Sequence, residues 1–380
     1  MTDHCDIISN PSASSHEKRS SNIELLRIIS VFLICLTHFC GFSGFQWSSL
    51  TPGLYTIQCM SLGGRMGVNV FILITGYFLV NKSFSGKKVI RLYMEVFFYS
   101  ISLCLLTSLV FGENMTAQDW HMALMPISSN KYWFATAYIT LYLFVPFLNL
   151  FIRALSKKMH FCLICVCVGI WTIGFLITQS NANYSDFLWF ILLYFVGAYI
   201  RLYPPHHFTG CLPNLACVFA LCLLAFVNIY LSNNISSGYL LNVTSFYRLD
   251  HYFTFFTALF LFLAFLNLRI PYLKWINIVA SASLGIYLIQ ENFWFRKYLW
   301  SELLSSAKFQ ESPFLIPYAI GVALLVYFVF TLIDLMRQFF LEKPLMKFID
   351  RFGPTISAPF LRIWTRIWRK IWFDKNDVIE

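Results

Sequence analysis

Long apolar stretches separated by short polar connections run through the chain from residue 22 to residue 336. Each is about 20 residues long, the length that an α-helix needs to cross the hydrocarbon core of a bilayer. Strands of a β-barrel would instead alternate in polarity over shorter segments. The pattern predicts an all-α polytopic membrane protein with about ten transmembrane helices, at residues 24–44, 62–81, 89–111, 132–152, 160–179, 186–203, 212–232, 251–268, 274–292 and 313–336.

The polar ends of the chain set the boundaries of the predicted domains. Residues 1–21 are rich in serine, and the apolar run that follows is too long for a signal peptide and has no cleavage site after it. Residues 22–336 form the predicted transmembrane domain, and residues 337–380 form a basic cytoplasmic tail. Tryptophans recur every four residues from Trp364 to Trp372, opposite a basic face. This spacing predicts an amphipathic interfacial helix that contacts anionic lipids of the inner leaflet.

Composition and charge agree with a membrane protein and predict its orientation. Hydrophobic residues make up 58% of the chain and charged residues only 12%. If the N-terminus is cytoplasmic, the outer connections hold only six of the 28 lysines and arginines, which are Arg65, Lys131, Arg248, Arg296, Lys297 and Lys308. The positive-inside rule then places both termini in the cytoplasm. The net charge of +10 reflects this topology, so no nucleic-acid partner is predicted.

The cysteines give no sign of a metal centre. Most of the eleven lie inside apolar runs, where a free thiol behaves as a small hydrophobic side chain. Cys162, Cys165 and Cys167 are closely spaced but belong to such a run. The sequence therefore predicts no metal site.

Two ionisable residues lie inside the first apolar run. Arg27 and His38 are eleven residues apart, which returns a helix to almost the same face about 16 Å further along its axis. Ionisable groups inside a bilayer are costly and usually face a protein interior or a wet cavity. A neutral imidazole can take a proton near neutral pH, so His38 is predicted to be a general base.

The second apolar run carries polar groups at a similar predicted depth. Arg65 and Asn69 are one helical turn apart, among glycines that allow helices to approach closely. A histidine base beside such polar donors is a plausible acyl-transfer site. The alternative for Arg65 is that its side chain extends to the outer lipid headgroups.

A basic pair begins the third run. Lys88 and Arg91 are three residues apart and share one helical face near the helix N-terminus, which suits a phosphorylated ligand. The alternative is an ordinary basic flank of a membrane helix. Glu95, one turn later, is placed to pair with Arg91.

Three carboxylates near the ends of later runs are further candidates. Glu291 is predicted to bind the molecule that accepts the acyl group or to pair with Arg65. Asp250 is predicted to contact the same acceptor. The alternative for Asp250 and its neighbour His251 is a solvated helix cap. Asp334 is predicted to pair with Arg337.

Together these motifs resemble acyltransferase family 3, polytopic enzymes that O-acylate bacterial surface polysaccharides and related glycans. The resemblance covers residues 22–335 and rests on motifs in the expected order. They are Arg27 with His38, Gly67-Val-Asn-Val-Phe-Ile-Leu-Ile-Thr-Gly-Tyr-Phe-Leu79, Lys88-x-x-Arg91, Tyr132-Trp133 with Leu141-Tyr-Leu-Phe-Val-Pro146, Leu193-Tyr-Phe-Val-Gly-Ala198 and Ser283-Leu-Gly-Ile-Tyr-Leu-Ile289. The chain departs from the family at Lys88, where arginine is common, and at Gln290, where histidine often occurs.

The resemblance implies an acyl-CoA donor, usually acetyl-CoA, and a glycan or lipid-linked sugar acceptor at the bacterial cytoplasmic (inner) membrane. Lys88 and Arg91 would hold the CoA phosphates, and His38 would take the proton of the attacking hydroxyl. Arg27, Arg65 or Asn69 would orient His38 or stabilise the developing oxyanion. A variant has His38 itself receive the acyl group. The charged membrane helices also fit a glycan-precursor transporter or flippase, or a membrane sensor or scaffold without turnover.

Overall fold

The computed structural model describes residues 20–178, 184–204, 209–235 and 243–352. Helices dominate these ranges and no strand occurs in them, so the predicted all-α class is confirmed. The N-terminal polar segment and the amphipathic helix predicted around Trp364 lie outside the described residues. The predicted cytoplasmic location of both termini stays a prediction.

Seven helices within the described ranges are long and apolar enough to cross a membrane, judged by length and composition. They are α1 (Ser21–Phe42), α2 (Pro52–Leu79), α3 (Gly86–Phe111), α5 (Trp133–Ala154), the helix Lys157–Thr178 formed by α6, η1 and α7, α9 (Cys211–Asn234), and the helix Leu315–Phe352, which begins as α13 (Leu315–Arg337). The chain is an integral multi-pass membrane protein. The predicted number of ten crossings is not confirmed by these criteria.

The other three predicted spans are helical but shorter. They are α8 (Asp186–Leu202), α10 (Tyr252–Leu266), and a pair of half-length helices, α11 (Lys274–Ser281) and α12 (Ser283–Glu291). The expected continuous helix at 274–292 is therefore interrupted at Ala282. The last helix, in contrast, runs beyond its predicted end through η6 (Gln338–Glu342) to Phe352, so the tail begins as a continuation of α13.

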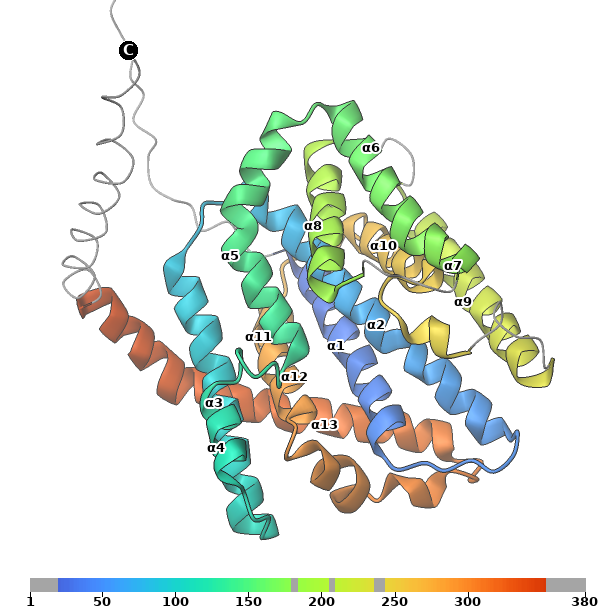
Figure 1. Cartoon of the computed structure of the whole chain (residues 1–380), viewed down its shortest axis with the longest axis vertical. Helices are drawn as coiled ribbons and strands as arrows, with labels where there is room; N and C mark the ends of the chain where they lie inside the picture. The colour runs from blue at the N-terminus through green and yellow to red at the C-terminus, as the bar shows by residue number, and fades with distance from the viewer. Residues whose placement is uncertain (1–19, 179–183, 205–208, 236–242, 353–380) are drawn as a thin grey trace, which may run out of the picture.

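Helix α1 is surrounded by other helices. It packs against α2, α10, α11, α12 and α13, and Figure 1 shows α1 and α2 running together through the middle of the molecule. Leu26, Cys35 and Phe39 on α1 are fully buried. Polar groups on this helix are therefore enclosed by protein along much of its length, as the costly burial of ionisable residues requires.

Glycines on α2 allow its neighbours to come close, as predicted. A Cβ atom at Gly67 would lie 2.7 Å from the carbonyl oxygen of Ser30 on α1. A Cβ atom at Gly76 would lie 2.3 Å from the carbonyl oxygen of Tyr194 on α8. Both distances are shorter than a van der Waals contact, so only glycine fits at these crossings.

This close packing gives a test of the fold. Gly76→Ala should lower the free energy of unfolding by about 1–3 kcal/mol, because the methyl group forces α2 and α8 apart. The matched control is Gly41→Ala, at a helical glycine whose Cβ would meet no atom within 4 Å. Thermal unfolding in detergent should show a lower midpoint for Gly76→Ala only. Equal midpoints for both variants would contradict the α2–α8 packing.

Candidate active site

His38 lies near the end of α1 and faces a carboxylate. Its Nε2 atom is 3.1 Å from Oε2 of Glu291, the last residue of α12, and only 14% and 9% of the two side chains are exposed. The Nδ1 atom of His38 has no hydrogen-bond partner among the described residues. Buried Gln290 lies close to His38 as well, although its amide atoms are outside hydrogen-bond geometry. Oε2 of Glu291 has no hydrogen-bond partner among the described residues either, so the structure pairs an imidazole and a carboxylate from distant parts of the sequence by a close charge contact.

Hydrogen bonds hold the chain that carries Glu291. Asn292 donates through Nδ2 to the hydroxyl oxygen of Tyr132, at 2.7 Å. Its Oδ1 atom accepts from the backbone N–H groups of Trp294 (3.1 Å) and Phe295 (2.9 Å). Asn292 and Tyr132 are both fully buried. The turn after α12 is therefore tied to the start of α5, which fixes the position of Glu291 beside His38.

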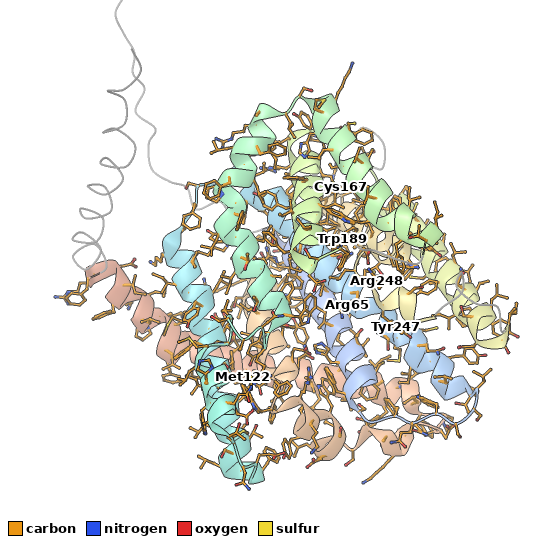
Figure 2. The ribbon with its side chains drawn as sticks, viewed as in Figure 1. Arg65, Met122, Cys167, Trp189, Tyr247 and Arg248 are labelled. Carbon is orange, nitrogen blue, oxygen red and sulfur yellow. The ribbon has the colours of Figure 1, made fainter. Side chains whose placement is uncertain are left out.

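Two arginines flank this pair. Arg296 donates through Nη1 to Oε1 of Glu291 at 3.3 Å, and its guanidinium lies over the ring of Phe42 at 4.5 Å from the centroid. The guanidinium of Arg65 lies over the ring of Trp133 at 4.8 Å. Figure 2 shows Arg65 near the centre of the molecule, and the charges of both arginines act on His38 and Glu291. Positive charge therefore surrounds the imidazole and the carboxylate.

A second group of cations, Arg27, Lys88 and Arg91, forms what we call the basic end. The ammonium group of Lys88 lies over the ring of Tyr142 at 4.6 Å, and the charges of Lys88 and Arg27 both act on Tyr138. Arg27 has a distant contact of 3.9 Å with Glu24, one turn earlier on α1. Since eleven residues of helix separate Arg27 from His38, the basic end lies about 16 Å along α1 from the imidazole.

A row of aromatic rings connects the basic end with His38. Tyr138 stacks on Phe134, one turn earlier on α5, with 5.9 Å between ring centroids. Phe134 contacts Tyr287 of α12 at 5.4 Å, and Tyr287 lies 6.4 Å from His38. The hydroxyl of Tyr287 is buried and has no hydrogen-bond partner among the described residues. Aromatic side chains of α5 and α12 thus form a continuous row from the basic end to His38.

The comparison with protein families decides what kind of protein this is. The family described as acyltransferase domain matches residues 20–334, which include His38, Glu291 and the basic end. The chain belongs to acyltransferase family 3. No curated protein and no solved structure matches it. The family membership confirms the resemblance that the sequence motifs indicated, and the protein is a membrane acyltransferase.

In this acyltransferase, Arg91 has a carboxylate partner that the sequence pattern did not indicate. Its Nε atom lies 2.7 Å from Oε1 of Glu342, in the continuation of α13, and the neighbouring Lys87 pairs with Asp350 of the same continuation. The predicted pair of Arg91 with Glu95 is wrong, because Glu95 contacts Arg337 at 3.0 Å instead. The sequence could not show the pairing of Arg91 with Glu342, because that contact requires the continuation of α13 to lie beside α3.

Arg337 is the centre of a buried charge cluster in the acyltransferase. It donates through Nε to Oδ1 of Asp334 at 2.7 Å and through Nη1 to Oε2 of Glu342 at 2.9 Å. The hydroxyl of Tyr99 also donates to Asp334 at 2.8 Å. The predicted pair of Asp334 with Arg337 is therefore confirmed, but as part of a larger network that joins α3 to α13.

Asn69 has structural partners in the acyltransferase. Its Nδ2 atom donates to the carbonyl oxygen of Leu249 at 2.9 Å, and its Oδ1 atom accepts from the indole of Trp189 at 3.0 Å. The residue is fully buried. These bonds tie α2 to α8 and to the segment before α10, and neither leads to His38. A catalytic role for Asn69 stays a prediction.

Asp250 also has a partner within the protein. Arg248 donates through Nε and Nη2 to its two carboxylate oxygens, each at 3.0 Å, and Asp250 is fully buried. The residue that caps α10 is His251, whose Nδ1 accepts from the backbone N–H of Phe253 at 3.4 Å. The alternative of a solvated cap is wrong, because His251 is only 3% exposed. Acceptor binding by Asp250 stays a prediction.

Proposed function

We propose that this acyltransferase moves an acyl group, most simply acetyl, from cytoplasmic acyl-CoA to a hydroxyl of a surface glycan or its lipid-linked precursor in the bacterial cytoplasmic membrane. The observation that carries the proposal is the contact of 3.1 Å between His38 and Glu291, two largely buried residues within the range matched by the family. A neutral imidazole beside a carboxylate is a suitable general base for a hydroxyl group. Orientation and charge stabilisation by the carboxylate follow the logic of acid–histidine pairs in acyl transfer.

His38 takes the proton of the acceptor hydroxyl while the oxygen attacks the thioester carbonyl carbon, and Glu291 stabilises the positive charge on the imidazolium. The tetrahedral intermediate then breaks its carbon–sulfur bond, and the imidazolium returns the proton to the leaving thiolate. The products are the ester and CoA. Arg296, which pairs with Glu291 beside His38, would stabilise the oxyanion of the intermediate.

The basic end would bind the donor. Lys88 and Arg91 lie on α3 close to its N-terminus, where side-chain charge and the helix dipole both favour phosphate groups. From there the pantetheine arm would follow the aromatic row of Tyr138, Phe134 and Tyr287 to His38. This arrangement supports a donor that enters at the opposite end of α1 from the acceptor.

A direct experiment tests the proposal. Membranes that contain the protein are supplied with acetyl-CoA labelled in the acetyl group, and surface glycan is then extracted. The expected result is label in the glycan as a base-labile ester. Absence of label, in cells that still make and export the glycan normally, would overturn the proposed reaction. A label that stays on the protein at His38 would instead indicate the acyl-histidine variant.

Substitutions at the basic end should act on donor binding in opposite directions. Lys88→Ala removes a contact to phosphate and should raise the apparent KM for acyl-CoA about tenfold, because a charged contact is worth roughly 1.5 kcal/mol or more. Glu342→Gln should lower this KM, because the carboxylate no longer competes with phosphate for Arg91. The exposed Lys158 provides a control, Lys158→Ala. An unchanged donor KM in both test variants would contradict phosphate binding at the basic end.

A further inference from the structure

We propose that the acceptor carries an anionic group, a carboxylate or a phosphate, which binds Arg65 while the reacting hydroxyl lies at His38. The inference rests on the proposed acyl transfer at His38 and adds the charge of the acceptor to it. Three observations support it. Arg65 contacts an aromatic ring and no described carboxylate, the groups around His38 carry a net positive charge, and Arg65 lies beside His38 rather than at the lipid headgroups.

Arg65 is only partly exposed and is held by an aromatic ring. Its guanidinium lies 4.8 Å from the centroid of the Trp133 ring, and within the described ranges no carboxylate is within ion-pair distance of it. Removing a charge from water without a partner is costly. Stacking on an aromatic ring leaves the N–H groups at the edge of the guanidinium available. These N–H groups can bind two oxygens of a carboxylate or of a phosphate.

The charges around His38 do not cancel. The charges of Arg65 and Arg296 both act on one carboxylate, Glu291, and of the two arginines only Arg296 hydrogen-bonds to it, at 3.3 Å. With a neutral imidazole, these groups carry a net positive charge. An anionic acceptor would neutralise it, and a neutral acceptor would not.

A further cation nearby has a separate counterion. The ammonium of Lys131 lies 3.7 Å from the centroid of the Phe293 ring, and its charge acts on Asp119. Hydrogen bonds from the Thr116 hydroxyl and the Trp294 indole hold the pKa of Asp119 below its usual value, so this carboxylate is ionised at neutral pH. Asp119 therefore balances Lys131 and leaves the excess charge at the two arginines.

The position of Arg65 argues against a simple contact with lipid headgroups. The backbone N–H of Gly64, the residue before Arg65, donates to the hydroxyl of Thr37, the residue before His38, at 2.8 Å, and the charge of Arg65 acts on His38 and Glu291. An arginine that extended to the membrane surface would be directed away from these groups. An anion bound to Arg65 would instead lie beside His38, where it can position an attached hydroxyl.

The anionic group could come from two sources, and matched acceptors separate them. Protein in lipid nanodiscs is supplied with labelled acetyl-CoA and one of four acceptors. The first pair is a hexuronic acid oligosaccharide and its methyl ester, which lacks the charge. The second pair is a neutral hexose oligosaccharide joined to polyprenyl diphosphate and the same oligosaccharide free. The pair that shows a charge effect identifies carboxylate or phosphate as the ligand of Arg65.

For the wild-type protein, loss of the anionic group should raise the acceptor KM at least about tenfold in one of the two pairs. Arg65→Gln should raise the KM for the charged acceptor to that of its neutral partner, so that the ratio of the two KM values falls to about one. Arg65→Lys should restore part of the preference, because it keeps the charge but not the planar donor group. The exposed outer cation Lys308 serves as control, and Lys308→Gln should keep the full preference.

Two results would overturn the inference. One is a wild-type enzyme that uses charged and neutral members of both pairs with equal KM. The other is a fall in kcat by the same factor for all acceptors in Arg65→Gln, which would make Arg65 an oxyanion stabiliser. Failure of the proposed function itself is distinct, since no acceptor would then be labelled and His38→Ala would equal the wild type. Thermal unfolding of each variant controls for misfolding.

Discussion

His38→Ala is expected to reduce kcat/KM for acyl transfer by about 10³-fold, because general-base catalysis typically contributes 10²- to 10⁴-fold. The loss should appear in kcat, with little change in the apparent KM for the donor, since the basic end lies far along α1 from the imidazole. Transfer of labelled acetyl to glycan, measured at equal amounts of protein in the membrane, checks this expectation.

A second histidine provides the control for this substitution. His121 lies on α4 (Ala117–Leu124), where it is exposed, and His121→Ala should keep full activity. If His38→Ala were as active as the wild type, the imidazole would have no part in the reaction. If instead both variants lost activity together, the effect would reflect expression or folding.

Glu291→Gln is the second substitution for which we expect a large effect, a fall in kcat of about 100-fold. The amide keeps the size of the side chain but loses the negative charge that stabilises the imidazolium 3.1 Å away. It also removes the counterion of Arg296. Rates of acetyl transfer at saturating donor measure the effect.

Two further variants separate the role of this carboxylate from general loss of charge. Glu291→Asp should recover part of the activity, because the charge is kept at a slightly longer distance from His38. The exposed Glu302 on η4 (Tyr298–Leu303) gives the matched control, and Glu302→Gln should behave as the wild type. Full activity of Glu291→Gln would show that the contact with His38 has no catalytic consequence.

The fold class could be predicted because the signal is local. A run of about 20 apolar residues predicts a membrane helix by itself, and each of the ten predicted runs is helical within the described residues. The interruption at Ala282 could not be predicted from apolar length, because the stretch 274–292 stays mostly apolar and only the small polar residues Ser281 and Ser283 flank the break. The extension of α13 beyond residue 336 could not be predicted from apolar length either, because its continuation is more polar than a typical membrane span.

The candidate site was predicted in part. His38, Arg65 and Glu291 were each selected from the sequence, and the structure brings them together. Their arrangement was not predicted, since the sequence indicated Arg65 or the acceptor as partners of Glu291 and gave no sign of its contact with His38. Acceptor binding by Glu291 stays a prediction. The hydrogen bonds of Asn69 and the pairing of Arg91 with Glu342 depend on contacts between helices far apart in the chain. No periodicity within one helix carries that information.

Helix α12 connects the buried charge cluster around Arg337 with His38. A Cβ atom at Gly285 would lie 2.2 Å from Oδ1 of Asp334, so this end of α12 rests directly on the buried charge cluster of α3 and α13. Its other end carries Glu291 against His38. The nine residues of α12 form a rigid helix about 13 Å long. A displacement of the cluster, which includes the partner of Arg91, would therefore be passed on to the carboxylate at the imidazole without the movement of any domain.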